Sequence, residues 1–283
     1  MRILFTLPHF FNPSQNGRHG SQRKDLHLRL QALTQCLTNL HQLFGKSQCM
    51  IDIAQRLAIP LSQSHDIDIV ICTTQDYHLL EDLHLPSYLY KHNPTKADPL
   101  LLGFECQAVL RDCFGQYDYY CFLEDDLILH DPWFFIKLAW FNELTGDLNL
   151  LQPNRYEVAT HHLVRKAYID GNLAPRVTAK FQNVEERPEI SGKIMNTPIV
   201  FRRALNPHSG CYFLNSRQMQ HWIEQPYFLD RDTSFVGALE SAATLGIMRA
   251  FKIYKPAPQH GNFLEIQHFG TAFLSLIGSQ VSL

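Results

Sequence analysis

Three consecutive carboxylates, Glu124, Asp125 and Asp126, directly follow an apolar and aromatic run at residues 119–123. A short, continuous, aromatic-rich run predicts a buried strand. Carboxylates at the carboxyl end of such a strand face the crevice in which open α/β sheets bind ligands. Neighbouring acids repel one another unless a cation neutralises them, and their oxygens suit Mg²⁺ or Mn²⁺, which bridge phosphates. The run therefore predicts a site for a metal-bound nucleotide or phosphate compound.

A helix cap or a solvated turn is the alternative explanation of the three acids. Acids favour helix N-termini, and Pro132 opens a predicted helix soon afterwards. However, Leu127, Ile128 and Leu129 continue the apolar run beyond the acids. A solvated turn is not normally enclosed by two apolar stretches, so the metal site is the favoured interpretation.

The elements before the acids alternate in type. We expect strands at 2–11, 66–74 and 119–123, a short strand at 87–90, and helices at 25–44, 50–58 and 100–114. This alternation is typical of a parallel sheet with helices on both faces. The fold class is therefore α/β, with a Rossmann-type sheet in the first half of the chain.

The second half is less regular. We expect strands at 148–158, 199–204 and 249–254, a loop or an excursion at 174–196, and helices at 133–144, 216–224 and 232–246. Asp232, Thr233 and Ser234 are predicted to cap the last helix. The helix at 133–144 is apolar on nearly every side, which predicts a buried core helix. A membrane-surface or dimer face is the alternative, because aromatic residues are enriched at both.

Composition narrows the class of protein. The 283 residues are 45% hydrophobic and only 18% charged, with a formal net charge of −2, which argues against nucleic-acid binding. The seven cysteines include no CxxC pair and are expected to be buried free thiols in a reducing compartment. No apolar stretch is long enough for a membrane span or a signal peptide. We expect a cytoplasmic or membrane-peripheral protein and make no prediction of its oligomeric state.

The segment at 117–126 resembles the DxD region of GT-A-fold, metal-dependent glycosyltransferases, in which a strand ends in acids. The resemblance implies a UDP- or GDP-sugar donor and a Mn²⁺ or Mg²⁺ ion. It places Glu124 and Asp126 at the outer positions of the motif as metal ligands, and Asp125 towards the donor ribose or sugar. It also implies a single domain at 1–283, with a nucleotide-sugar-binding half at 1–130 and an irregular acceptor-binding half at 131–283.

The resemblance also suggests a general base and a further metal ligand. Inverting members use an acid near the start of a late helix to deprotonate the acceptor, a role that Glu240 matches. Asp230 and Asp232 are alternative bases, and an exposed helix glutamate is the plain explanation of Glu240. A late histidine often ligates the metal in this family, and His268 is favoured over His260 for that role.

Residues near the first strand and before the acids complete the predicted donor site. The end of the first strand is expected to meet the nucleotide, and the helix before the acids to approach the donor. The residues concerned are Thr6, Pro8, His9, Gly103 and Arg111. The basic loop at 14–24 could meet phosphates, although a solvated loop is the favoured explanation.

These predictions converge on metal-dependent transfer of a sugar to a hydroxyl acceptor, such as a glycan or a lipid-linked acceptor, with inversion favoured. One alternative is a nucleotidyltransferase that makes nucleotide sugars. The bulky Leu7, Pro8 and His9 stand where its Gly-rich, basic signature should follow the first strand. The other alternative is a non-catalytic sugar- or partner-binding protein on the same fold.

Overall fold

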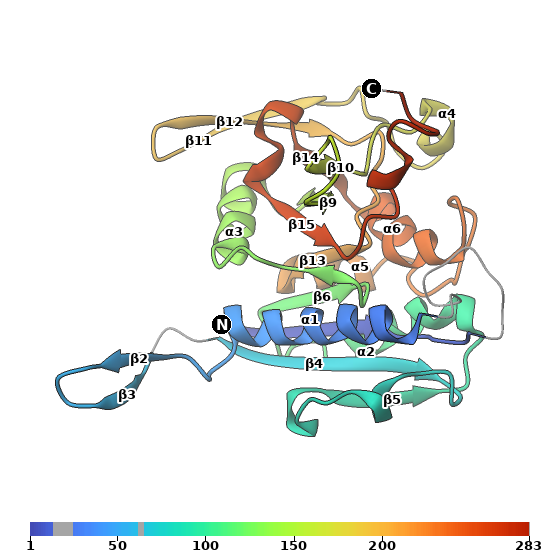
Figure 1. Cartoon of the computed structure of the whole chain (residues 1–283). Coiled ribbons are helices and arrows are strands. Elements are labelled where there is room, and N and C mark those ends of the chain that lie inside the picture. The colour runs from blue at the N-terminus through green and yellow to red at the C-terminus, as the bar shows by residue number, and fades with distance from the viewer. Residues whose placement is uncertain (14–24, 62–64, 283) are drawn as a thin grey trace.

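A five-stranded sheet forms the centre of the molecule (Figure 1). The computed structural model describes residues 1–13, 25–61 and 65–282, so the basic loop at 14–24 lies outside the described residues. The strand order is β13-β6-β1-β4-β5, with bounds β1 (Arg2–Pro8), β4 (Asp66–Thr74), β5 (Lys91–Thr95), β6 (Tyr119–Leu123) and β13 (Cys211–Asn215). Four strands are parallel, and β13 pairs antiparallel with β6. The continuous apolar runs of β1 and β6 suit strands that are buried on both faces.

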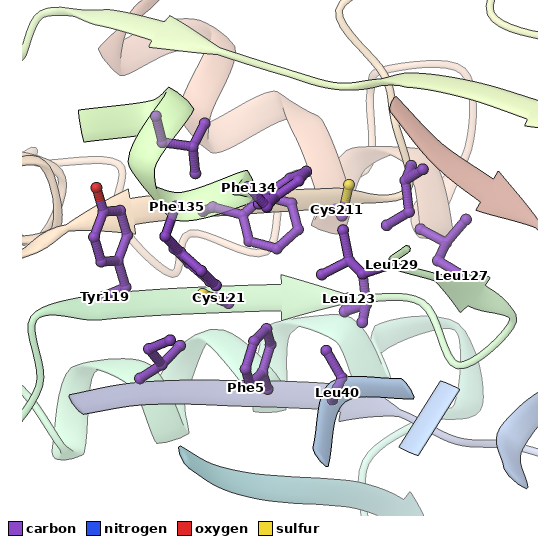
Figure 2. Close-up of a cluster of buried hydrophobic side chains, with 14 of the residues drawn as sticks. Phe5, Leu40, Tyr119, Cys121, Leu123, Leu127, Leu129, Phe134, Phe135 and Cys211 are labelled. Atoms are coloured by element: carbon purple, nitrogen blue, oxygen red, sulfur yellow. The ribbon is translucent and has the colours of Figure 1, made fainter. Parts of the chain in front are cut away.

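Helices cover both faces of this sheet. On β6, Tyr119, Cys121 and Leu123 point to one face, where α1 (Leu26–Phe44) and α3 (Phe134–Thr145) pack (Figure 2). Tyr120 and Phe122 point to the other face, where α2 (Leu102–Asp112), α5 (Ser216–Ile223) and α6 (Ala238–Ala250) pack. The predicted α/β class, with a Rossmann-type sheet covered on both sides, is confirmed.

The helix α1 starts at the carboxyl edge of the sheet. The side chain of Asp25 accepts a hydrogen bond from the Leu28 N–H at 3.0 Å and so caps the helix N-terminus. Buried leucines, including Leu33, Leu37 and Leu40, fix the inner face of the helix against the core. As a result, the first turn of α1 brings Arg29 towards the end of β6.

Two smaller sheets form the second half. One has the order β10-β9-β15-β7, and the other has the order β11-β12-β14-β8. Their bounds are β7 (Leu127–Ile128), β8 (Asn149–Leu151), β9 (Asn154–Val158), β10 (Lys166–Tyr168), β11 (Glu189–Ile194), β12 (Thr197–Arg203), β14 (Lys252–Pro256) and β15 (Glu265–His268). Figure 1 shows them on the side of β6 and β13, away from β4 and β5. Since β7 directly follows the acids, the first of these sheets reaches the predicted site.

Two predictions in the first half are wrong. Residues 50–58 do not form a helix but a hairpin of β2 (Cys49–Asp52) and β3 (Leu57–Pro60), with Arg56 at φ +56° in its turn. Isoleucines at alternating positions favour an extended backbone, which the prediction overlooked. Residues 87–90 do not form a strand, because 87–89 make a 3-10 turn, and β5 follows as the fourth parallel strand.

Three boundaries in the second half also differ from the predictions. Asp232 does not cap a helix, because α6 begins at Ala238 after Gly237, whereas Asp232 accepts the Ser234 N–H in a separate turn. The predicted strand at 148–158 is two strands, β8 and β9, separated at Gln152 and Pro153. The segment at 174–196, where a loop or an excursion is predicted, contains regular elements, namely the short helix α4 (Pro175–Thr178) and β11.

The apolar helix α3 is mainly a core element, as predicted. Phe134, Phe135 and Phe141 are buried, whereas Trp133 and Ile136 are 55% and 59% exposed. In the described part of the chain, no helix combines the length and apolarity that a membrane crossing requires.

We predict that Gly103→Ala lowers the free energy of unfolding by about 1–3 kcal/mol, measured by chemical denaturation. A Cβ at Gly103 would lie 2.6 Å from the Ala242 Cβ, so α2 and α6 would have to separate. Gly171→Ala is the matched control, because a Cβ there meets nothing within 4 Å. Equal stability of the two variants would contradict the close helix contact.

Candidate active site

Five elements converge on the three acids that follow β6. Thr6 of β1 pairs with Phe122 of β6 in a parallel ladder, so the strand ends and the residues after them share one edge of the sheet. The Gly210 carbonyl before β13 accepts the Glu124 N–H at 3.0 Å. β15 pairs with β7 next to the acids, and α1 and β9 supply further side chains. The predicted site is therefore built from both halves of the chain.

Asp125 is held between two basic side chains and is only 3% exposed. The His9 Nδ1 lies 2.5 Å from Asp125 Oδ2, and the His9 Nε2 accepts the Leu79 N–H at 3.1 Å. Since Nε2 is an acceptor, the proton sits on Nδ1 and is donated to Asp125. Burial lowers the pKa of His9, in keeping with this neutral form. Arg29 donates to the other oxygen of Asp125. The role of Asp125 towards the donor sugar stays a prediction.

Asp126 is a charged carboxylate with one unused oxygen. Its Oδ2 accepts from Arg29 Nη1 at 3.1 Å and lies 3.9 Å from His268 Nε2. Its Oδ1 is buried and has no hydrogen-bond partner among the described residues. Burial alone raises the pKa of Asp126, but the positive charges of His268, Arg29 and Arg155 outweigh it and hold the pKa below its usual range. Asp126 thus offers a cation a full negative charge and a free oxygen.

Glu124 faces Arg155, whose Nη1 lies 3.5 Å from Glu124 Oε2. Arg155 is in turn held by Asp170, which accepts from its Nη2 at 2.8 Å and its Nε at 3.0 Å. Burial raises the pKa of Glu124 to about 7, because it outweighs the attraction of Arg155, and the charges of Asp126 and Glu240 add to the rise. Gly210, at φ +60°, leaves room for this carboxylate, since a Cβ there would overlap Glu124 Oε2.

Glu240 lies near the acids, whereas the alternative bases are engaged elsewhere. It stands in the first turn of α6 and folds back towards Gly237, and its charge is felt at Glu124. It makes no hydrogen bond or ion pair with the residues that the structure describes. Asp230 and Asp232 both pair with Arg249, at 2.8 and 3.7 Å. Hydrogen bonds from Ser234 lower the pKa of Asp232, which makes it a weaker base.

The other predicted residues are placed as follows. Thr6 is fully buried and donates to the Cys121 carbonyl at 3.1 Å, and Pro8 ends β1 next to His9. Gly103 packs against α6, and Arg111 is exposed beside Asp112 in the last turn of α2, which leads to the start of β6. His260 accepts the Val200 N–H at 3.1 Å and belongs to the neighbourhood of β12. The structure therefore brings Thr6, Pro8 and His9 to β1 beside β6, but neither Arg111 nor His260 to the acids.

The three predicted metal ligands are not arranged as a preformed metal site. Among the described residues, no group of three or more His, Cys, Asp or Glu side chains is placed to hold a metal ion. However, Mg²⁺ is usually held by one or two carboxylates together with substrate phosphates. Asp126 Oδ1 and His268 Nε2 fit such a site as its protein ligands, whereas Glu124 is turned to Arg155.

A separate hollow of about 350 Å³ lies at the other end of β6. Asp118, Tyr119, Asp147 and Arg217 are among the residues that line it. It includes none of the three acids and is at the amino edge of the strand, where open α/β sheets do not normally bind ligands. We therefore place the candidate site at the acids rather than in this hollow.

Sequence reasoning missed the basic partners of the acids. Arg29 and Arg155 supply the positive charge next to them, and Glu157 supports His268 with a hydrogen bond of 2.8 Å. Arg155 and Glu157 alternate along β9, so they point to one face of that strand. Two charged residues on one face of a predicted buried strand were the available signal.

Three solved structures illustrate what the chain is similar to. S. aureus TarS matches with a TM-score of 0.47 and 8% identity, over 96% of this chain and 37% of that chain. TarS 1–349 in complex with UDP-GlcNAc matches with a TM-score of 0.43 and 10% identity, over 96% and 62%. The CMP:2-keto-3-deoxy-manno-octonic acid synthetase complexed with CTP matches with a TM-score of 0.41 and 10% identity, over 91% and 92%.

These likenesses are too distant to carry function, and the chain spans less than two thirds of either TarS chain. No protein-family model matches the chain, and no curated protein sequence matches it. The function is therefore inferred from the site itself.

We predict that raising the pH from about 4.5 to about 7 costs the protein roughly 2–3 kcal/mol of unfolding free energy through Glu124. The pKa of Glu124 is higher in the folded than in the unfolded chain. In this window the folded chain keeps a proton that the unfolded chain has lost, so the loss is absent at lower pH and complete above about 7.

The measurement is denaturant unfolding across this pH range for the wild type and for Glu124→Gln. Other groups also titrate here, among them His268, whose pKa is raised because Asp126 and Glu157 outweigh its burial. The Glu124 contribution is therefore the difference between the two curves. Parallel curves would contradict the raised pKa.

Proposed function

We propose that this protein transfers a sugar from a nucleotide-sugar donor to a hydroxyl acceptor, with a divalent cation at Asp126 and His268. The observation that carries the proposal is the buried Asp126 Oδ1, which has no hydrogen-bond partner among the residues that the structure describes and lies at the carboxyl end of a central parallel strand. A buried carboxylate oxygen without a partner is costly, and a cation would satisfy it. The imidazole of His268, whose Nε2 lies 3.9 Å from the other oxygen of Asp126, Oδ2, is a fitting second ligand.

The protein groups around the acids have complementary tasks in this reaction. A cation bound here would neutralise the charge that develops on the diphosphate leaving group. Arg29 offsets the charge of Asp125 and Asp126, so the acids do not repel an approaching diphosphate. His9 and Arg29 together hold Asp125 in one orientation, which favours a fixed contact to the donor over a mobile one.

Glu240 is the proposed general base. The acceptor oxygen forms a bond to the anomeric carbon while the bond from that carbon to the diphosphate breaks, and the acceptor proton passes to the Glu240 carboxylate. Such a base must be unpaired and within reach of the acceptor. Among the candidates on late elements, Glu240 meets the first condition, whereas Asp230 and Asp232 are paired with Arg249.

We predict that the protein releases nucleoside diphosphate from a UDP- or GDP-sugar only when Mn²⁺ or Mg²⁺ is added. Asp126→Asn should lower this rate by about 100-fold or more, because it removes charge stabilisation of the leaving group. Asp131→Asn is the matched control, since Asp131 is a nearby carboxylate that pairs with Lys137 instead. The assay measures diphosphate release across a panel of donors.

Release that continues at full rate in Asp126→Asn would overturn the donor-site assignment. A protein that binds these donors, as shown by a raised melting temperature, but releases no diphosphate with any acceptor would instead be a binding protein.

We predict that Glu240→Gln lowers kcat for transfer by about 100-fold or more and leaves the donor KM nearly unchanged. The amide cannot take the acceptor proton, but the donor contacts remain in place. Asp232→Asn serves as the matched control and should retain wild-type activity. If Asp232→Asn loses activity and Glu240→Gln does not, then Asp232 is the base and our assignment is wrong.

A further inference from the structure

Glu157 is a fully buried carboxylate whose partners lie at the candidate site and in the segment that follows it. Its Oε1 accepts from His268 Nδ1 at 2.8 Å. Its Oε2 accepts the backbone N–H groups of Phe273 at 3.0 Å and Leu274 at 2.6 Å. A buried charge is tolerated only when its lone pairs are used in this way. Glu157 therefore joins β9, β15 and the turn at Phe273 in one hydrogen-bonded unit.

The contacts of His268 fix the direction of its ring. Nδ1 is committed to Glu157, and the ring of Phe273 packs edge-on against the imidazole, with 5.7 Å between centroids. Nε2 consequently points to Asp126 Oδ2, 3.9 Å away, a distance too long for a direct hydrogen bond. The second oxygen of Asp126, Oδ1, is the one that has no hydrogen-bond partner in the described part of the chain. The imidazole thus faces a carboxylate that can accept a further partner.

The same arrangement recurs in metal sites, where the ligating histidine donates its other ring N–H to a carboxylate. That carboxylate fixes the tautomer and makes the ligating nitrogen more basic. Here the carboxylate would be Glu157, the histidine His268 and the ligating atom Nε2. Because Glu157 does not touch the gap between His268 and Asp126, it would act through His268 alone.

We propose that Glu157 is a positioning residue, which keeps the proton of His268 on Nδ1 so that Nε2 can ligate a divalent cation together with Asp126. This inference rests on the proposed function, because the cation would be the one that accompanies the donor diphosphate. It adds the segment from Phe269 to Leu274 to the site. That segment is tied to the Asp126 carbonyl by the Phe269 N–H at 2.8 Å and to Glu157 by Phe273 and Leu274.

Glu157→Gln tests this assignment. The amide has one acceptor oxygen, which the N–H groups of Phe273 and Leu274 claim, so its NH₂ turns to His268 Nδ1. The ring must then carry its proton on Nε2, where it faces Asp126 and blocks the cation. We expect Mn²⁺ affinity in the presence of UDP, measured by electron paramagnetic resonance, to fall about 10- to 100-fold. Nitrogen-15 spectra without metal should show the change of tautomer.

Glu265→Gln is the matched control, because Glu265 is a carboxylate of the same strand as His268 that pairs with Lys166 and Tyr168. It should keep wild-type Mn²⁺ affinity and tautomer. Since a change at a buried carboxylate can unfold a protein, the tautomer is also measured in the wild type at alkaline pH. A proton on Nε2 there overturns the proposal without any variant.

The failure of this inference is distinguishable from that of the proposed function. If the wild type binds Mn²⁺ with UDP and Glu157→Gln binds it equally well, Glu157 has no positioning role, and the proposed transferase activity is untouched. If the wild type binds no Mn²⁺ with or without UDP, the protein has no cation site here, and both proposals are wrong about the metal.

Discussion

The repulsion between three adjacent carboxylates is the constraint around which this structure is arranged. Glu124, Asp125 and Asp126 follow a buried strand, where water screens their charges poorly. Positive groups from other elements offset them: Arg29 from α1, Arg155 from β9 and His268 from β15. The second half of the chain therefore contributes to the site itself, because it supplies part of the charge that keeps the acids together.

The three acids are not equivalent, and their surroundings explain why. Asp125 is held by two basic partners, whereas Asp126 stays charged and has one oxygen without a hydrogen-bond partner among the described residues. Glu124 shares Arg155 with the fully engaged Asp170, and its pKa rises to about 7. One run of acids thus yields a fixed anchor, the carboxylate that we propose as a cation ligand, and a group that can change its protonation near neutral pH.

Much of the sheet could be predicted from the sequence, because β1, β4 and β6 each contain an apolar run that favours a buried strand. The hairpin at residues 49–60 was missed, because its apolar side chains stay exposed and burial does not decide its structure, which leaves the alternating isoleucines as the signal. The placement of the three acids at the carboxyl edge of the sheet was predicted from their position after an apolar run. Arg29 and Arg155 were not, because an arginine on a helix or strand finds its partner only through tertiary packing.

The contacts that close the site join distant parts of the chain. His9 and Asp125 are 116 positions apart, Arg29 and Asp126 are 97 apart, and Glu157 and His268 are 111 apart. Contacts that close loops of this length form late in folding, because the chain must lose the loop entropy before it gains the stabilising contacts. A nucleotide that binds at the site as proposed would consequently bind only fully folded chains. Nucleotide binding would therefore indicate that the whole molecule is folded.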